Sequence, residues 1–159
     1  LGSHMVMLAG KAESTEEARG MLEEVMQNGK ALEVFKTFLA SQGGDASVID
    51  DPSKLPTAKY MIEVPAKASG YISGIQAEEI GVAAMMLGAG RATKESEIDL
   101  AVGIVLNKKV GDEVAEGESL VTVHTNSEDI EKVLEKIYGA YSISTEKVQA
   151  PTLIYTEIH

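Results

Sequence analysis

The sequence predicts an α+β protein, in which a helical segment at residues 1–44 precedes a small antiparallel or mixed β barrel-like domain with two helices. Two observations support this class. In the first segment, apolar side chains recur every three or four positions, which is the spacing of one face of an α-helix. From Lys59 the period changes to two, because Tyr60, Ile62 and Val64 alternate with other residues. Strand patterns interrupted by two helical stretches are typical of an α+β domain.

The helical segment carries local signals for helix starts and ends. Ser14-Thr15-Glu16-Glu17 is a capping box, in which Glu follows Ser three positions later. Asn28-Gly29 is typical of a helix end, and a second amphipathic run ends before Gly43-Gly44. A further helix is expected from Met5 to Ala12. The apolar positions would form a stripe that packs on a body outside the chain or on the second region: Ala18, Met21, Leu22, Val25, Met26, Leu32, Phe35, Phe38 and Leu39.

The first residues require an interpretation of their own. Gly2-Ser3-His4-Met5 is identical to a common remnant of a cleaved affinity tag, which would have to be excluded from structural reasoning. Leu1 is not the residue that such a cleavage leaves, so we interpret residues 1–9 as native. Position 1 is not a methionine, and we expect the chain to be a piece of a longer protein.

Residues 45–58 are interpreted as a linker, because Asp50-Asp51-Pro52 and Pro56 break any regular pattern. The second domain then spans residues 59–159. Within it the sequence predicts a helix at Glu78 to Leu87, a buried strand at Ile98 to Leu106, a helix capped by Asn126 or Ser127, and a closing strand at Pro151 to Ile158.

The stretch from Val105 to His124 contains the clearest turn signals. Gly111-Asp112 and Gly117-Glu118 punctuate a run of apolar residues. Glycine reaches the positive φ angles of tight turns, and an adjacent Asp can bond the turn backbone. The stretch therefore predicts two β-hairpin corners in quick succession.

Composition excludes several classes of function. The chain has 159 residues with 14 basic and 25 acidic side chains, a formal net charge of −11. We therefore expect neither nucleic acid nor an anionic membrane as a partner, because both require basic clusters. There is no cysteine, which excludes disulfides and is compatible with a cytoplasmic location. No apolar run approaches the roughly 20 residues of a membrane span.

The pattern of the two turns resembles that of biotinyl and lipoyl carrier domains, so a standalone binding or carrier module is an alternative. In those domains a modified lysine lies at the tip of an exposed hairpin. Here the first lysine after the turns is Lys132, inside a helical pattern, and Met85-Met86 encloses none. Lys108 and Lys109 precede the first turn, where a solvated strand end is the simpler interpretation.

Two stretches carry a second resemblance, which covers the whole chain. One is Ala40-Ser41-Gln42-Gly43-Gly44-Asp45, with the helices before it. The other runs from Gly88-Ala89-Gly90-Arg91-Ala92-Thr93-Lys94-Glu95 through Ile98 to Ile104 and into Val110-Gly111-Asp112. They are similar to the late helices and the hammerhead-like C-terminal domain of the pyrimidine nucleoside phosphorylase and thymidine phosphorylase family.

This resemblance implies an activity for the full-length enzyme. The family performs the reversible phosphorolysis of uridine, thymidine or deoxyuridine to a base and ribose- or deoxyribose-1-phosphate, with phosphate as co-substrate. Its Lys-His-Ser-Thr-Gly-Gly phosphate loop and its base site do not occur in this sequence. We therefore assign no catalytic, cofactor-binding or metal-binding residue here, and expect the chain alone to be inactive. The expected partners are the missing N-terminal part, a pyrimidine nucleoside and phosphate, and the full-length enzyme is expected to be a cytoplasmic homodimer.

One loop is the candidate for a functional role. It joins a predicted helix to a predicted buried strand and combines small residues with two cations and an acid: Gly90, Arg91, Ala92, Thr93, Lys94, Glu95 and Ser96. The glycines follow a helix and lack the full nucleotide-binding fingerprint, so a nucleotide loop is not expected. The resemblance implies a loop at the mouth of the cleft between two domains, which could order when they close over substrate. The alternative is that Arg91 is an ordinary surface charge.

Overall fold

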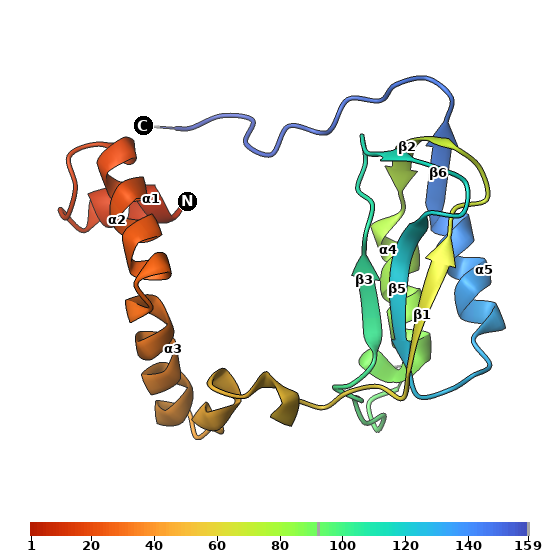
Figure 1. Cartoon of the computed structure of the whole chain (residues 1–159), viewed down its shortest axis with the longest axis horizontal. Helices are drawn as coiled ribbons and strands as arrows, with labels where there is room; N and C mark the ends of the chain where they lie inside the picture. The colour runs from red at the N-terminus through yellow and green to blue at the C-terminus, as the bar shows by residue number, and fades with distance from the viewer. Residues whose placement is uncertain (92, 159) are drawn as a thin grey trace. The chain divides into compact units, whose positions relative to one another are not determined.

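The computed structural model describes residues 1–91 and 93–158 and divides the chain into two units, Leu1–Leu55 and Pro56–His159 (Figure 1). The first, here called the helical unit, contains α1 (Gly2–Leu8), α2 (Thr15–Gln27) and α3 (Lys30–Ser41). Two short 3₁₀ turns follow, η1 (Ala46–Ile49) and η2 (Pro52–Lys54). The second unit, here called the β domain, holds all the strands.

The start of α2 confirms the predicted capping box. The Ser14 Oγ accepts a hydrogen bond from the backbone N–H of Glu17 at 3.1 Å, and the Glu17 carboxylate accepts one from the N–H of Glu13 at 2.9 Å. These bonds satisfy backbone donors that have no partner inside the helix. At the other end, Gly29 has φ +82°, which a residue with a Cβ rarely adopts. The first helix ends at Leu8, earlier than the predicted Ala12.

Few side chains of the helical unit are buried. Among its residues Ala18 is the one that is fully buried, and Phe38 is 58% exposed. Met21 and Phe35 of the predicted stripe are also exposed, while Leu22, Val25 and Leu39 are half-buried. The helices are therefore present without a core of their own.

The β domain contains two antiparallel three-stranded sheets, which are not closed into a barrel. The fold class is α+β as predicted, but the barrel-like closure is absent. The first sheet has the order β1-β5-β3, with strands Tyr60–Pro65, Ser119–Thr125 and Gly103–Leu106. The second has the order β4-β2-β6, with strands Glu113–Val114, Gly70–Ile75 and Tyr141–Ser144.

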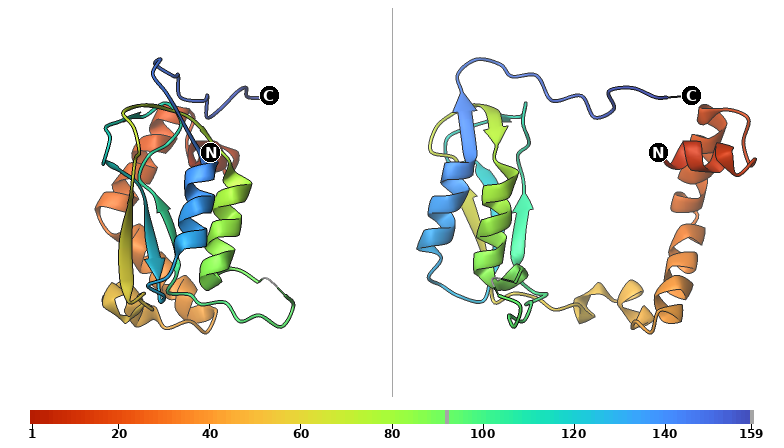
Figure 2. Two further views of the ribbon diagram at one scale, coloured as in Figure 1. Left: turned by 90° about the vertical axis from the view of Figure 1, so that its right-hand side faces the viewer. Right: turned by 180° about the vertical axis from the view of Figure 1, so that it is seen from behind.

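Two helices cover one side of the β domain. α4 (Ala77–Ala84) continues into a π-helical turn, η3 (Met85–Ala89), and α5 is Glu131–Ala140. The left view of Figure 2 shows α4 and α5 side by side against the sheets. The buried apolar side chains of sheets and helices form one core: Val64, Ala66, Ile72, Ile80, Ala83, Val114, Leu120, Val121, Val123, Ile130, Val133, Ile137, Ala140 and Tyr141.

The glycine turns form as predicted, but they do not make hairpins. Gly111 and Gly117 have φ +96° and +85°. However, β4 pairs with β2, whereas β3 and β5 pair with each other in the other sheet. The Gly111 N–H donates to the Ile72 carbonyl at 2.8 Å, and the Gly117 N–H donates to the Ala66 carbonyl at 2.9 Å. Each turn is thus held by a distant segment, and the chain crosses between sheets instead of folding back on its neighbour.

Two strand predictions are wrong in part or entirely. The strand predicted from Ile98 begins only at Gly103, and Leu100 is 78% exposed, because Asp99 bends the chain before the strand. No strand forms at 151–158, where every described side chain is exposed and no neighbouring strand supplies hydrogen bonds. Within the described residues, no helix is long and apolar enough to cross a membrane.

Candidate domain-closure loop

The candidate loop leaves the end of η3 and returns to the start of β3. Gly88 has φ +103° and ends the helical turn, and Gly90 is extended. A Cβ at Gly88 would lie 3.7 Å from the Asp99 Cβ and 3.8 Å from the Val102 Cγ2, which are ordinary contacts. The backbone angle, more than the available space, therefore favours glycine at position 88.

The predicted loop residues form a small turn that presents its charges to solvent. Arg91, Lys94 and Glu95 are exposed, whereas Gly90 and Ser96 are half-buried; Ala92 lies outside the described residues. The Ser96 Oγ accepts from the Thr93 N–H at 3.0 Å and lies 3.0 Å from the Thr93 Oγ1. The Ser96 N–H also donates to the Thr93 carbonyl at 3.2 Å. These bonds bring Thr93 and Ser96 together, while the side chains of Arg91 and Lys94 are exposed to solvent.

Asp99 anchors the returning end of the loop. Its N–H donates to the Gly88 carbonyl at 2.9 Å, so the two ends of the loop are joined directly. Its Oδ1 accepts from the Ala101 N–H at 2.9 Å, and its Oδ2 accepts from the Asn126 Nδ2 at 2.7 Å. The Asn126 Oδ1 in turn accepts from the N–H of Lys59 at 2.9 Å.

This anchor was not predicted from the sequence. Asn126 was expected to cap the following helix, but the N-cap of α5 is Ile130, which makes no side-chain capping bond. A signal was available for Asp99, because Asp two residues before a small residue is typical of a side chain that bonds the backbone ahead of it. No local pattern could have joined Asn126 to Asp99 or Lys59.

A second hydrogen bond lies at the same end of β1. The Tyr60 hydroxyl donates to the Glu128 Oε1 at 2.7 Å. This bond to a carboxylate raises the pKa of Tyr60 above its ordinary value, because losing the proton would place two negative charges together. It ties β1 to the segment before α5 without touching the candidate loop.

The lysines are not placed as a carrier domain would require. Lys132 lies in α5, not at a hairpin tip. Lys108, predicted to be solvated, is half-buried and its Nζ lies 2.5 Å from the Glu118 Oε1 and donates to the Glu113 carbonyl at 2.9 Å. Among residues 1–91 and 93–158, no three His, Cys, Asp or Glu side chains gather where a metal ion could be held.

Comparison with known proteins identifies the domain. Residues 71–144 match the family described as the pyrimidine nucleoside phosphorylase C-terminal domain. Residues 71–144 are thus similar to a pyrimidine nucleoside phosphorylase C-terminal domain. The matched range includes α4, the candidate loop, both glycine turns and α5, and the resemblance drawn from the sequence is confirmed.

Similarity to full-length relatives extends beyond this domain. The chain is 66% identical over 158 residues to the pyrimidine-nucleoside phosphorylase of Geobacillus stearothermophilus and 63% identical over 158 residues to that of Bacillus subtilis. It is 57% identical over 155 residues to that of Staphylococcus aureus. The alignments cover 98–99% of this chain but only 36% of each relative, at the C-terminal end. The helical unit and the β domain therefore both have counterparts in these enzymes, and the carrier alternative is not favoured.

Proposed function

We propose that this chain acts as the C-terminal part of a pyrimidine nucleoside phosphorylase. The full-length enzyme would convert uridine, thymidine or deoxyuridine and phosphate to a free base and a pentose-1-phosphate. The observation that supports this proposal is the 66% identity to a phosphorylase of that name over 99% of the chain. We also propose that the full-length enzyme is a homodimer that acts in nucleoside salvage in the cytoplasm. Light scattering of the purified enzyme would test its oligomeric state.

The chain alone is proposed to be inactive. Phosphorolysis requires donors that hold phosphate near the anomeric carbon and that stabilise the charge on the departing base. The sequence lacks the phosphate loop expected for this family, and loss of a single such donor costs about 10²–10³ in turnover. Purified residues 1–159, incubated with uridine or thymidine and phosphate, should release no base, while the full-length enzyme assayed in parallel should. Turnover by the pure chain would contradict this part of the proposal.

We propose that the β domain supplies the closure loop, Gly90 to Ser96. Supporting features are its two exposed cations, its small residues and the hydrogen bond between Asp99 and Gly88 that joins the segments on either side of it. Closing such a loop over a bound nucleoside and phosphate excludes water and commits the complex to reaction. Phosphate is anionic, so a cation that approaches on closure stabilises the closed form.

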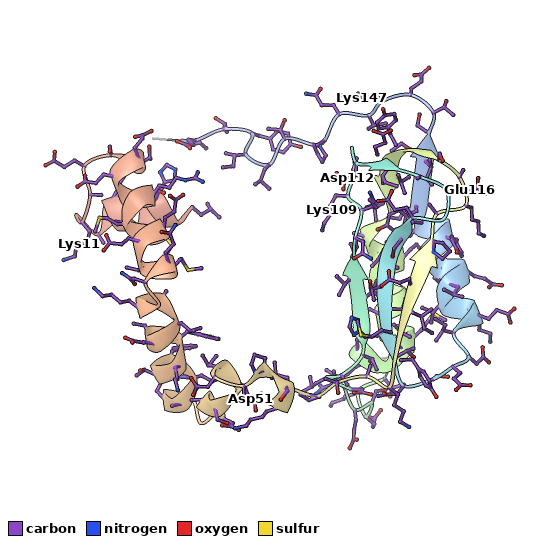
Figure 3. All side chains as sticks on the ribbon, in the orientation of Figure 1. Lys11, Asp51, Lys109, Asp112, Glu116 and Lys147 are labelled. Carbon is purple, nitrogen blue, oxygen red and sulfur yellow. The ribbon has the colours of Figure 1, made fainter. Side chains whose placement is uncertain are left out.

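Arg91→Ala in the full-length enzyme tests this role. We expect a decrease in kcat of about tenfold, which corresponds to about 1.4 kcal/mol of lost transition-state stabilisation, with little change in thermal stability. Lys109→Ala is the matched control, since Lys109 is an exposed cation beyond the opposite end of β3 (Figure 3). Wild-type kinetics in Arg91→Ala would reduce that residue to an ordinary surface charge.

A further inference from the structure

Four segments of the chain meet at one pair of residues, Asp99 and Asn126. Asn126 lies directly after β5, and Asp99 lies where the candidate loop returns toward β3. Through Asn126 the pair holds Lys59, the residue before β1, by a 2.9 Å hydrogen bond. Through the N–H of Asp99 it holds Gly88 at the end of η3, also at 2.9 Å. Lys59 is close to the boundary of the β domain at Pro56, so the pair joins the entry of the chain to both ends of the loop.

We propose that Asp99 and Asn126 form a positioning clamp that couples the entry of the chain into the domain to the closure loop. The inference rests on the proposed closure role of that loop. In the proposed closure, the segment that leads into β1 is the covalent connection through which a displacement of the helical unit reaches the β domain. The clamp transmits that displacement to the loop across hydrogen bonds instead of along the 39 residues of chain between Lys59 and Asp99.

The chemistry of the clamp is directional. The Lys59 N–H is a donor, so the side-chain atom bonded to it is an acceptor, and the Asp99 carboxylate is an acceptor, so the atom bonded to it is a donor. An Asn side chain supplies one of each from a single planar amide, whereas Asp supplies acceptors alone. Asp99 in turn uses both carboxylate oxygens as acceptors, one for Ala101 and one for Asn126. The order of donors and acceptors therefore fixes which residue can stand at each position.

This directionality allows a test by exchange of the two residues. In Asp99→Asn, an amide nitrogen replaces one acceptor, so at least one of the bonds to Ala101, Asn126 or Lys59 must be lost. In Asn126→Asp, two carboxylates would face each other across the 2.7 Å contact and repel. In the double variant, the new Asp accepts from Lys59 and from the new Asn, whose oxygen accepts from Ala101. All three bonds can form again with the two residue types exchanged.

Amide hydrogen exchange in the 1–159 chain measures the clamp without any assay of activity. Loss of one such bond should accelerate exchange at Lys59 or Ala101 about fivefold in each single variant, corresponding to a net hydrogen bond of ordinary strength. The double variant should return both amides to within about twofold of the wild-type rate. Additive acceleration in the double variant would overturn the inference, because it would show that the two side chains act independently.

Kinetics of the full-length enzyme then measure positioning. Each single variant should lower kcat about fivefold with a smaller change in KM, and the double variant should recover wild-type turnover. Tyr60→Phe is the matched control, since it removes the neighbouring bond to Glu128 and leaves the clamp intact. Its turnover should equal that of the wild type.

The outcomes separate this inference from the proposed closure role. If Arg91→Ala lowers turnover but the clamp variants do not, the loop acts without the clamp and the inference is overturned. If Arg91→Ala and the clamp variants are all silent while exchange changes as expected, the closure role itself fails. If Tyr60→Phe lowers turnover as much as the clamp variants do, the effect reflects general loosening of this end of β1, and the inference is again overturned.

Discussion

The helical unit and the β domain use different sources of order. The helices of the first unit are set by neighbouring residues, as in the bonds between Ser14, Glu13 and Glu17. The strands of the second pair residues that are far apart in sequence, such as Tyr60 with Thr125. In the first unit a single described side chain, Ala18, is fully buried, whereas the second has a continuous core. Local signals therefore suffice to place helices, but burial concentrates where distant segments meet.

This difference has consequences for stability. Helices shorter than about 15 residues are marginal in water without tertiary packing. The helical unit exposes Phe35, Phe38 and Met21, so we expect a further surface to cover them. In the proposed full-length enzyme that surface would come from the preceding part of the chain. The β domain carries its own core and should unfold as a separate cooperative unit.

The largest expected effect is truncation of a core side chain in the β domain. Ile137 of α5 is fully buried, and Ile137→Ala should lower the free energy of unfolding by about 2–5 kcal/mol through lost burial and a residual cavity. Phe38→Ala in the helical unit is the contrast, because that side chain is 58% exposed. We expect it to change stability by less than about 1 kcal/mol in this chain. Urea unfolding followed separately in each unit would measure both, and equal effects would contradict the comparison.

A glycine substitution in β2 should have the next largest effect. A Cβ at Gly70 would lie 2.4 Å from the carbonyl oxygen of Ser144, and backbone cannot move aside as a flexible side chain can. Gly70→Ala should therefore cost about 1–3 kcal/mol through overpacking. Gly74→Ala in the same strand is the control, since its Cβ would come no closer than 3.8 Å to Ser142. Thermal unfolding of the two variants compares them, and equal midpoints would refute the steric argument.

The contrast between local and long-range contacts also separates what the sequence could predict from what it could not. The capping box at Ser14, the positive φ at Gly111 and Gly117, and both helices of the β domain follow from residues close together in the chain. Whether β4 pairs with β2 or with its neighbours depends on contacts to Ile72 and Ala66, which no short window contains. The closing strand predicted at 151–158 is wrong, because the residues of a segment do not by themselves supply a neighbouring strand with which it can pair.

The candidate loop shows the same limit. The types and order of its residues predict the loop, and its turn at Thr93 to Ser96 is local. Its anchor is not, because Asn126 reaches Asp99 and Lys59 from the far end of β5. Side-chain amides are frequent in loops for several reasons, so composition alone cannot tell a helix cap from an interstrand tie.

A smaller effect of opposite sign is expected in the helical unit. A Cβ at Gly20 in α2 would meet nothing within 4 Å, and its backbone is helical. Gly20→Ala should stabilise α2 by about 0.5–1 kcal/mol, because glycine loses more backbone entropy than alanine. Gly29→Ala has equal space but φ +82°, so it should destabilise instead. Amide exchange in α2 should slow in the first variant and accelerate in the second, and slowing in both would show that backbone conformation does not decide the sign.

The smallest expected effect is a pH dependence of the β domain. The Glu63 carboxylate of β1 accepts hydrogen bonds from Ser119 and from Thr122, the latter at 2.9 Å. These bonds, with a smaller contribution from the charge of His124, hold the pKa of Glu63 below its ordinary value of 4.5. Folding therefore favours the ionised form. The stabilisation is complete above the unfolded-state pKa and is lost as the pH falls through the lower folded-state pKa.

Glu63→Gln should remove this part of the acid sensitivity, since an amide does not titrate in this range. Urea midpoints measured between about pH 6 and about pH 3 should fall less steeply in the variant than in the wild type. Glu116→Gln is the control, because Glu116 contacts Ser69 through its backbone N–H and not through its carboxylate. The Glu63 carboxylate is solvent-accessible, so the difference in slope should be modest. Parallel pH profiles for wild type and Glu63→Gln would show that the hydrogen bonds from β5 do not favour the ionised carboxylate.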